Sequence, residues 1–423
     1  MLTVLRRVAI LVRHRAVVQN HFCDASLVRK QHQLEPAVSA NPRSIEMIKK
    51  LCSFDTTSRN SNLELIGYVQ QYLEDHGVQS TLVHDETGAK ANLFATIGPA
   101  DKPGICLSGH TDVVPVDGQD WDTDPFNIVE KDGRLWGRGT SDMKSFVSVA
   151  LSMTKDFVDA DLKTPVHFAF SYDEEVGCIG VRRLIAQFDQ MPVRPRGCIV
   201  GEPTEMKVIT AHKGKLSHRC HVHGFECHSS LAPHGVNAVE YAAEIVAFLR
   251  RMGREIAVSG PFDDKYDVAH TTVHTGLMHG GTALNIVPKD CYFDFEFRHL
   301  PEDEPYELFA RVTNFVDTEL LPEMRKVNPD ADIRFDIISQ MPGLNMSDDH
   351  ELTTFVKQLT GANSTSKVAF GTEAGLFQQA DVPTIICGPG SIDQAHKPNE
   401  FIRLDEIEKC EKFLNLLKER LAA

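Results

Sequence analysis

The segment ICLSGHTD, residues 105–112, joins a short apolar run to a histidine and an aspartate. The apolar run at 105–107 is typical of a strand that is buried on both faces of a sheet. His110 and Asp112 lie two residues apart, so in an extended chain their side chains project on the same side. Open α/β sheets bind ligands at the carboxyl ends of their strands. The segment therefore predicts a buried strand that ends in a functional site.

Three more short apolar runs have the same character, at 166–170, 198–200 and 384–386, and each is followed closely by polar residues that can bind metals. Amphipathic segments lie between these runs. In residues 144–157 the apolar side chains follow helical spacing, which predicts a helix with one buried face. The alternation of strands and helices predicts an α/β domain with a mixed sheet flanked by helices.

The middle of the chain has a different order of elements. Residues 216–222 predict a strand, and Asn237 with Glu240 three residues on predicts the capped start of a helix. Two strands, a second helix and a closing strand follow, near 269–276, 290–297, 308–316 and 332–339. The order β-α-β-β-α-β is that of a ferredoxin-like α+β unit. We expect this unit to be an inserted domain at 212–341, between two parts of a larger domain at 42–211 and 342–423.

The N-terminal segment 1–41 differs in composition from the rest. Its first 35 residues hold six basic and two acidic residues. An Arg-rich, acid-poor leader is typical of a mitochondrial transit segment, but a solvated tail or a start codon assigned too early fits as well. We expect a cytoplasmic protein, or a mitochondrial one if this segment is a transit signal. The folded chain should begin near Asn41.

Composition narrows the class of protein. The 423 residues include 44 Lys and Arg against 59 Asp and Glu, a formal net charge of −15, which disfavours binding to nucleic acid or anionic lipid. We therefore expect no nucleic-acid partner. No apolar run approaches the length that crosses a bilayer, so we expect no membrane span. The ten cysteines are scattered without a Cys-x-x-Cys pair, which favours free thiols in a reducing compartment.

Further candidate ligands follow the predicted strands and turns. Asp142 lies in a glycine-rich turn before a helix, where it could equally be a helix cap. Glu174 and Glu175 are adjacent carboxylates, which repel each other unless a cation neutralises them or one keeps its proton. A pair in an exposed loop would need neither. Glu202 and His396 also follow apolar strands. Each residue alone is weak evidence. Together with His110 they form a mixed nitrogen and oxygen set that suits zinc, cobalt or manganese better than calcium.

Six motifs, in order along the chain, carry a resemblance to a known family: 109–115, 137–144, 173–175, 201–204, 228–230 and 388–400. From about residue 42 to the C-terminus the chain resembles the acetylornithine deacetylase branch of the zinc-dependent aminoacylase and succinyl-diaminopimelate desuccinylase family. The resemblance implies a metallohydrolase that removes the acetyl group from N2-acetyl-L-ornithine in arginine biosynthesis. The amide would be hydrolysed without a covalent intermediate.

The resemblance also implies a role for each candidate residue. The chain would bind one or two zinc ions, for which cobalt could substitute. The ligands would be His110, Asp142, Glu175, Glu202 and His396. Asp142 would bridge the two ions, with His110 and Glu202 on one and Glu175 and His396 on the other. Glu174 would be the general base. Asp112 would accept a hydrogen bond from the outer nitrogen of His110 and fix its tautomer.

The inserted domain at 212–341 resembles the part of the family that forms homodimers. There His228 matches a histidine that stabilises the oxyanion in the partner's site. A surface-loop histidine is the alternative, but the flanking Ser229-Ser230 and Asn237-Ala238 also match and favour the active-site role. Arg298 matches an arginine that binds the substrate carboxylate, a planar group suited to a guanidinium fork. The remaining residues that match substrate-contacting segments are Asn285, Gly371, Thr372 and Glu373. Glu373 could pair with the ornithine amine.

Other interpretations stay open at this point. A related N-acyl-amino-acid deacylase, a succinyl-diaminopimelate desuccinylase or a dipeptidase would share the metal ligands and differ only in the pocket. A non-catalytic metal-binding scaffold would need the ligands but not Glu174. The His and Cys residues between 218 and 228 resemble a zinc site, but strand alternation places His218 and Cys220 on one face and His221 and His223 on the other.

Overall fold

The structure is a computed structural model that describes residues 40–191 and 193–423. The predictions for the N-terminal segment before Ala40 lie outside the described residues. Helix α1, Pro42–Cys52, begins directly after Asn41, whose side chain accepts a hydrogen bond from the Arg43 amide. Among the described residues, no helix combines the length and apolar character needed to cross a membrane.

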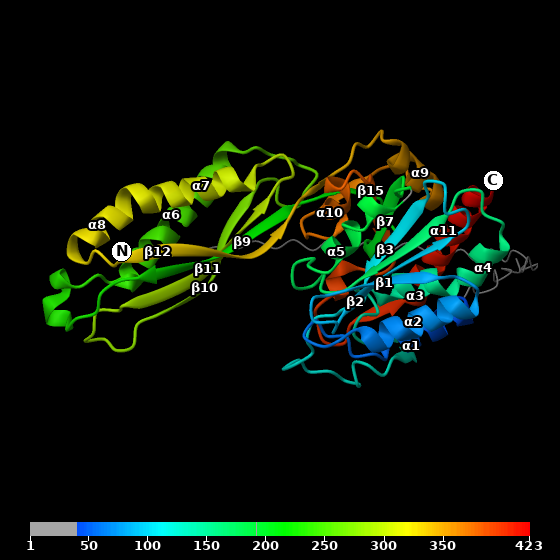
Figure 1. Ribbon diagram of the computed structural model, residues 1–423, viewed down its shortest axis with the longest axis horizontal. Helices are drawn as coiled ribbons and strands as arrows, with labels where there is room; N and C mark the ends of the chain where they lie inside the picture. The colour runs from blue at the N-terminus through cyan, green and yellow to red at the C-terminus, as the bar shows by residue number, and fades with distance from the viewer. Residues whose placement is uncertain (1–39, 192) are drawn as a thin grey trace, which may run out of the picture. The chain divides into compact units, whose positions relative to one another are not determined.

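A nine-stranded mixed sheet forms the centre of the larger domain (Figure 1). The four predicted strands are its four central ones, in the order β6, β3, β7 and β15, and all four are parallel. Their bounds are Val166–Ser171, Ile105–His110, Gly197–Pro203 and Thr384–Gly388. Every residue of these strands is buried, as a strand covered on both faces requires.

The outer strands complete this sheet. On one side lie β2 (Ala91–Ile97) and β1 (Ser80–His84), both antiparallel to their neighbours. On the other side lie β8 (Ile209–His212), β13 (Leu344–Asn345) and β14 (Ser366–Val368). A separate small sheet joins β16, β5 and β4, which are Phe401–Arg403, Arg134–Trp136 and Val129–Lys131.

Helices cover both sides of the central strands. Helix α3 packs on β3 and β7 and is itself packed against α1 and α11. Helices α5 and α10 pack on β6, β2, β7 and β15, while α2 lies on β1 and β2. The bounds are α2 Leu63–Asp75, α3 Lys144–Ser152, α5 Val181–Ile185, α9 Glu351–Thr360, α10 Ala374–Gln379 and α11 Leu404–Ala422. The α/β class and the mixed sheet flanked by helices are thus confirmed.

The helix predicted at 144–157 is divided in two. Helix α3 ends at Ser152, and a second helix, α4, spans Thr154–Asp159. The hydroxyls of Ser152 and Thr154 donate to the carbonyls of Val149 and Leu151, at 2.8 and 2.7 Å. Side-chain donors of this kind compete with the backbone ladder and favour a break. The hydrophobic periodicity alone did not reveal it.

The segment Gly214–Met341 forms its own antiparallel sheet, in the order β10, β11, β9 and β12. Its elements are β9 Gly214–His223, α6 Ala238–Ser259, β10 Thr272–Gly280, β11 Asp290–His299, α7 Pro305–Phe315, α8 Leu321–Val327 and β12 Asp332–Met341. This is the ferredoxin-like order. Asn237 caps α6 as predicted, because its side chain accepts from the amides of Val239 and Glu240.

Strand β10 is displaced from its prediction, since it ends at Gly280 and not at residue 276. Gly276 lies where the register between β10 and β11 shifts, between Thr275 and Leu277. A glycine in a strand often marks such a bulge and not the end of the strand. The pairing therefore continues past a residue that the sequence pattern treats as a boundary.

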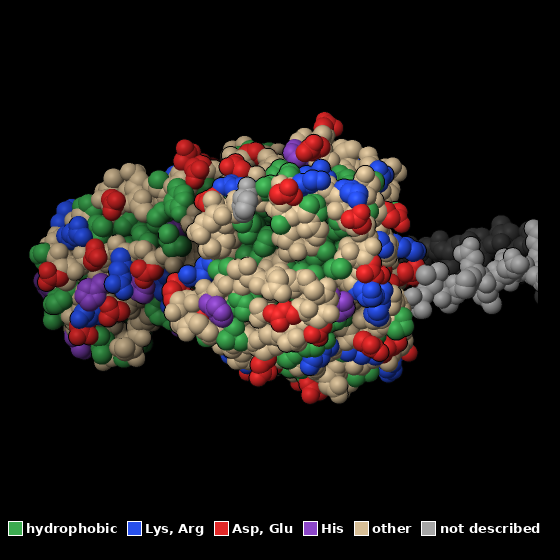
Figure 2. Space-filling model, turned by 45° about the vertical axis from the view of Figure 1, so that its right-hand side comes forward, with side chains coloured by type: hydrophobic (Ala, Val, Ile, Leu, Met, Phe, Trp, Pro, Cys, Tyr) green, Lys and Arg blue, Asp and Glu red, His purple; other side chains and the backbone are tan. Residues whose placement is uncertain are grey.

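The two faces of β9 differ in burial. Leu216, His218, Cys220 and Val222 are buried against the helices, and His221 and His223 are more exposed, as the alternation predicted. His218 is stacked between two phenylalanines, with ring centroids 3.9 Å from Phe309 and 5.5 Å from Phe295. On the opposite face, His221 and His223 are paired with Asp336 and Asp290. Figure 2 shows acidic and basic side chains interspersed over the visible surface.

We predict that His218 makes the fold sensitive to acid. Burial lowers the pKa of His218 from 6.5 to about 4. Between these values the unfolded chain takes up a proton at His218 and the folded chain does not, so stability is lost as the pH falls through this range. His218→Phe keeps an aromatic ring that cannot titrate. Between pH 7 and pH 5 the wild-type unfolding free energy should therefore fall by about 2 kcal/mol more than that of the variant.

Urea unfolding at the two pH values measures this difference. Val222→Ala, on the buried side of the same strand, is the control: it destabilises the segment without removing a titratable group, so it should keep the acid sensitivity of the wild type. Equal losses in wild type and His218→Phe would contradict the neutral, buried state of His218.

Candidate metal centre

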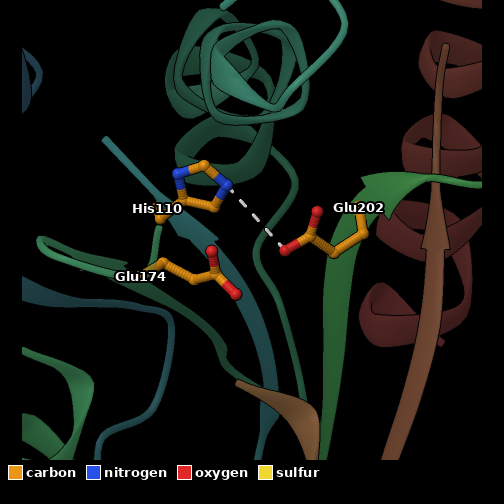
Figure 3. A group of neighbouring side chains, drawn as sticks. All are labelled: His110, Glu174 and Glu202. Carbon is orange, nitrogen blue, oxygen red and sulfur yellow. Dashed lines mark ion pairs between the residues drawn. The ribbon is translucent and has the colours of Figure 1, made fainter. Parts of the chain in front are cut away.

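Three neighbouring parallel strands bring the first group of candidate ligands together. His110 is the last residue of β3, Glu202 lies near the end of β7, and Glu174 lies in the turn after β6. Figure 3 shows the three side chains turned toward one another. One ligand atom from each lies within 4.8 Å of the others, and His110 Nε2 is 3.9 Å from Glu202 Oε1. Their placement follows from the parallel order β6-β3-β7, which aligns the carboxyl ends of the strands.

Asp142 joins this group to a second one. Its Oδ1 atom lies 3.1 Å from His110 Nε2, and its Oδ2 atom lies 3.3 Å from His396 Nε2. His396 Nε2 is also 3.0 Å from Glu175 Oε2. His110, Asp142 and Glu175 form the second set of ligand atoms within 4.8 Å. The two oxygens of one carboxylate thus face two histidines, the arrangement that a bridging ligand needs.

The helix-cap interpretation of Asp142 does not fit this geometry. Helix α3 begins at Lys144 after Met143, and no side-chain cap hydrogen bond is made at this end. The Asp142 carboxylate is directed at the histidines instead. Sequence alone could not separate these alternatives, because both place an aspartate just before a helix.

The residues fit a divalent cation. The buried Glu202 Oε1 atom has no hydrogen-bond partner among the described residues. A buried carboxylate oxygen without a partner is costly, and a cation would satisfy it. Imidazole nitrogens and carboxylate oxygens in one small group are suited to zinc and related transition metals. The donor set therefore fits a divalent metal ion, and the identity of the ion stays a prediction.

The pKa values of these side chains also favour a bound cation. Burial raises the pKa of Glu174 to about 8, and burial together with Asp142 raises the pKa of Glu175 and Glu202. Burial opposes protonation of His110, but Asp142 and the surrounding glutamates raise its pKa well above the usual value. Without a cation the group thus retains protons to limit its negative charge. Ligands must lose these protons to bind a metal, so binding would be coupled to proton release.

Asp112 differs in one respect from its predicted role. His110 Nδ1 donates to the main-chain oxygen of Asp112 at 2.9 Å, whereas the nearest carboxylate oxygen is 3.6 Å away. The Asp112 carboxylate accepts from Ser58 Oγ at 2.7 Å and from the amides of Glu174 and Glu175 at 3.1 and 3.3 Å. The backbone therefore sets the His110 tautomer, and the carboxylate holds the turn that carries the two glutamates.

Glu373 also lies elsewhere than predicted. Its side chain is fully buried, and its two oxygens accept from Ser108 Oγ at 2.5 Å and from Ser171 Oγ at 2.8 Å. An amine would have to displace a serine hydroxyl to reach it, so pairing with a substrate amine is not supported. Thr372 is buried as well, and Gly371 is partly exposed. The sequence showed an acidic residue in a loop but not that the loop folds inward.

The remaining candidates lie in the ferredoxin-like segment and belong to neither ligand group. His228 is exposed, and its Nδ1 accepts from the Ser230 amide at 3.2 Å. The Ser229 amide donates to the Asn285 carbonyl, so the two loops carrying His228 and Asn285 lie side by side. Arg298 Nε donates to Glu296 Oε1 at 2.9 Å, and the arginine side chain is one-third exposed.

Comparison with known proteins identifies the family of this chain. A model of peptidase family M20/M25/M40 matches residues 106–420. An acetylornithine deacetylase from Photorhabdus laumondii subsp. laumondii is 31% identical over 383 residues, which cover 89% of this chain and 96% of that protein.

Two solved structures show the same fold. An M20 family metallo-carboxypeptidase from Sulfolobus solfataricus has a TM-score of 0.72 at 18% identity and covers 90% of this chain and 99% of its own. A dinuclear metal-binding peptidase of the M20 family from Bacillus subtilis has a TM-score of 0.60 at 14% identity, with 90% and 98% covered.

We predict that Asp142→Ala is the most damaging change to metal binding, because it removes the carboxylate that faces both histidines. The loss of an outer-shell partner alone typically weakens metal binding about 10–100-fold, so this variant should lose more. Calorimetric titration of the metal-free protein with Zn²⁺ or Co²⁺ gives the number of ions and their affinities. Asp159→Ala, on the exposed face of α4, is the control. Unchanged binding at every site would reduce Asp142 to a turn residue.

Proposed function

Because this chain belongs to peptidase family M20/M25/M40, we propose that it is a metal-dependent amide hydrolase that removes the acetyl group from N2-acetyl-L-ornithine. The observation that carries the proposal is the group of carboxylates and imidazoles at the ends of β3, β6 and β7, with the unpartnered Glu202 oxygen among them. The 31% identity to a relative named acetylornithine deacetylase supports the substrate. The reaction would belong to arginine biosynthesis, and the scattered cysteines favour a cytoplasmic location.

The proposed ligands divide into two sets that share Asp142. His110 and Glu202 would complete one site, and Glu175 and His396 the other, with zinc as the proposed ion and cobalt as a substitute. A bound divalent ion polarises a carbonyl oxygen and makes water a stronger acid. The two oxygens of Asp142 lie beside different histidines, Oδ1 beside His110 and Oδ2 beside His396, which supports two sites that share this carboxylate.

Glu174 is the proposed general base. Its carboxylate lies within 4.8 Å of ligand atoms of His110 and Glu202, its amide is held by Asp112, and Cys178 Sγ donates to its Oε1 atom at 3.3 Å. Burial raises the pKa of Glu174 to about 8. A carboxylate with a raised pKa can accept a proton from the attacking water and return it to the leaving amine nitrogen near neutral pH.

The ferredoxin-like segment would supply the rest of the site across a homodimer. We infer that residues 212–341 form the dimer contact and that His228 donates to the developing oxyanion in the partner's site. His228 is exposed and belongs to neither ligand group, which supports a role outside its own centre. Arg298 would bind the substrate carboxylate. Asn285 lies at the opposite end of β11, beside the His228 loop, and would contact the substrate together with His228. Among the described contacts only Nε of Arg298 is engaged, which leaves its fork for a carboxylate.

A substrate panel tests the proposal. N2-acetylornithine, N-acetylmethionine, succinyl-diaminopimelate and dipeptides are compared after reconstitution with Zn²⁺ or Co²⁺, with a chelated sample as the control. We expect kcat/KM for N2-acetylornithine to exceed the others by at least about tenfold. A higher value for another substrate would identify a related deacylase, desuccinylase or dipeptidase. A protein that binds metal but hydrolyses none of them would be a scaffold.

We predict that Glu174→Gln abolishes turnover while metal content stays normal, because the amide keeps the shape of the side chain but cannot carry a proton. General base catalysis typically contributes about 10²–10⁴-fold in rate. Metal analysis of the same sample excludes a ligand role. Glu255→Gln, an exposed glutamate of α6, is the control. Hydrolysis close to the wild-type rate, or loss of metal together with activity, would reject Glu174 as the base.

We predict that mixing two inactive variants restores activity if His228 acts across the dimer. Glu174→Ala chains are mixed with His228→Ala chains and allowed to exchange. In a mixed dimer one site carries both defects, and the other pairs an intact Glu174 with an intact His228. Statistical mixing makes half of the dimers mixed, so about a quarter of wild-type activity should return. If exchange is demonstrated and no activity returns, His228 does not act across subunits.

A further inference from the structure

Two charged side chains outside the proposed ligand set are completely buried beside it. Arg138 lies in the turn between β5 and α3, and Glu400 lies just before β16. Both are 1% exposed, and Arg138 Nη1 donates to Glu400 Oε2 at 2.7 Å. A buried ion pair is weak evidence for stability, because removing two charges from water offsets much of their attraction. Their other contacts indicate what the pair does.

Glu400 holds the turn that carries Asp142. Its Oε2 atom accepts from the Gly139 amide at 3.1 Å, and its Oε1 atom accepts from the amides of Ser141 and Asp142 at 2.7 and 3.0 Å. The main-chain oxygen of Glu400 accepts from the Gly137 amide at 2.9 Å. One residue therefore binds four amides of the turn 137–142. The position of the Asp142 carboxylate depends on this turn.

Arg138 connects the same turn to the loop that carries His396. Its Nη1 atom reaches the Lys397 carbonyl at 3.4 Å, and its Nη2 atom donates to Gln119 Oε1 at 2.7 Å. Gln119 Nε2 in turn donates to the His396 carbonyl at 3.1 Å. His396 has a φ of +63°, a left-handed conformation that non-glycine residues rarely adopt. The hydrogen bonds to the carbonyls of His396 and Lys397 hold this loop in place.

The two proposed metal sites differ in how their ligands are held. His110 and Glu202 lie on the central strands β3 and β7. His110 pairs with Ser171 of β6, and Glu202 lies between Val200 and Pro203, which both pair with β15. Asp142 and His396 lie in loops. Arg138, Glu400 and Gln119, which we call the ligand clamp, contact both of these loops and make no contact with His110 or Glu202 in the described hydrogen bonds.

We propose that the ligand clamp consists of positioning residues that set the distance between Asp142 and His396 and so build the second metal site, the one completed by Glu175. This inference rests on the proposed function, because it assigns the clamp to one of the two proposed ions. It predicts an asymmetry: damage to the clamp weakens the second ion far more than the first. A pair that served only the stability of the fold would not distinguish the two ions.

Titration of the metal-free protein with Co²⁺ tests this asymmetry, by calorimetry and by the visible absorption of the bound ion. Three proteins are compared with the wild type: Glu400→Gln, Gln119→Met and the control Asp263→Asn. Gln119 is only partly buried, so its variant should fold even if the loss of the Glu400 charge is not tolerated. Asp263 forms a largely buried ion pair with Lys367 that makes no contact with the ligand loops, so its variant reports the effect of losing such a pair elsewhere.

In the clamp variants the second Co²⁺ should bind about 10–100-fold more weakly, the usual effect of losing an outer-shell partner. The first should lose much less, because Asp142 is the only one of its ligands that the clamp holds. Activity should return at saturating Co²⁺, which a folding defect would not allow. The control should bind both ions normally even if its thermal midpoint falls.

Three results would overturn the inference. A wild-type protein that binds fewer than two ions would overturn the proposed two-metal centre and this inference with it. A wild-type protein that binds two ions, with clamp variants that bind both equally well, would overturn the inference alone. The same holds if the variants lose both ions in parallel.

Discussion

Several carboxylates lie together in this largely buried group, and they repel one another. The structure of the site depends on how this repulsion is balanced. Asp142, Glu174, Glu175 and Glu202 lie within reach of His110 and His396, and burial raises the pKa of the glutamates. Such a group persists only if protons or cations neutralise it. The unpartnered Glu202 oxygen favours a cation over further protonation. The strands β3, β6 and β7 and the loops beside them hold these charged side chains together.

Two kinds of support hold the group. Parallel strands position His110 and Glu202: His110 pairs with Ser171 of β6, and the neighbours of Glu202 on β7 pair with β15. Loops position Asp142, Glu175 and His396. Arg138 and Gln119 hold the His396 loop, and buried carboxylates hold the other two. Asp112 binds the amides of the Glu174–Glu175 turn, and Glu400 binds those of the Asp142 turn. Carboxylates thus have two uses here: some are the proposed metal ligands, and others accept hydrogen bonds from the main-chain amides of the turns that carry those ligands.

The sequence predicted the central strands, because each strand is a short apolar run. It also named the candidate ligands that the structure brings together, most of which come after such a run in the chain. It was less reliable where a second interaction competed with the pattern. The helix at 144–157 divides because the Ser152 and Thr154 hydroxyls bind nearby carbonyls. Strand β10 continues through a bulge at Gly276. Glu373 turns inward to two serines on β3 and β6, which lie more than 200 residues away in the chain.

The sequence by itself determined the α/β class, the ferredoxin-like segment and the residues able to bind metal, because apolar periodicity and side-chain chemistry are local properties. Only the tertiary structure decided which oxygen of Asp112 faces His110, that Asp142 is not a helix cap, and that Arg138, Glu400 and Gln119 join two loops. Those outcomes depend on distances between segments as far apart as Gln119 and His396. Such distances are set by the packing of the whole sheet and its helices, and no local pattern records them.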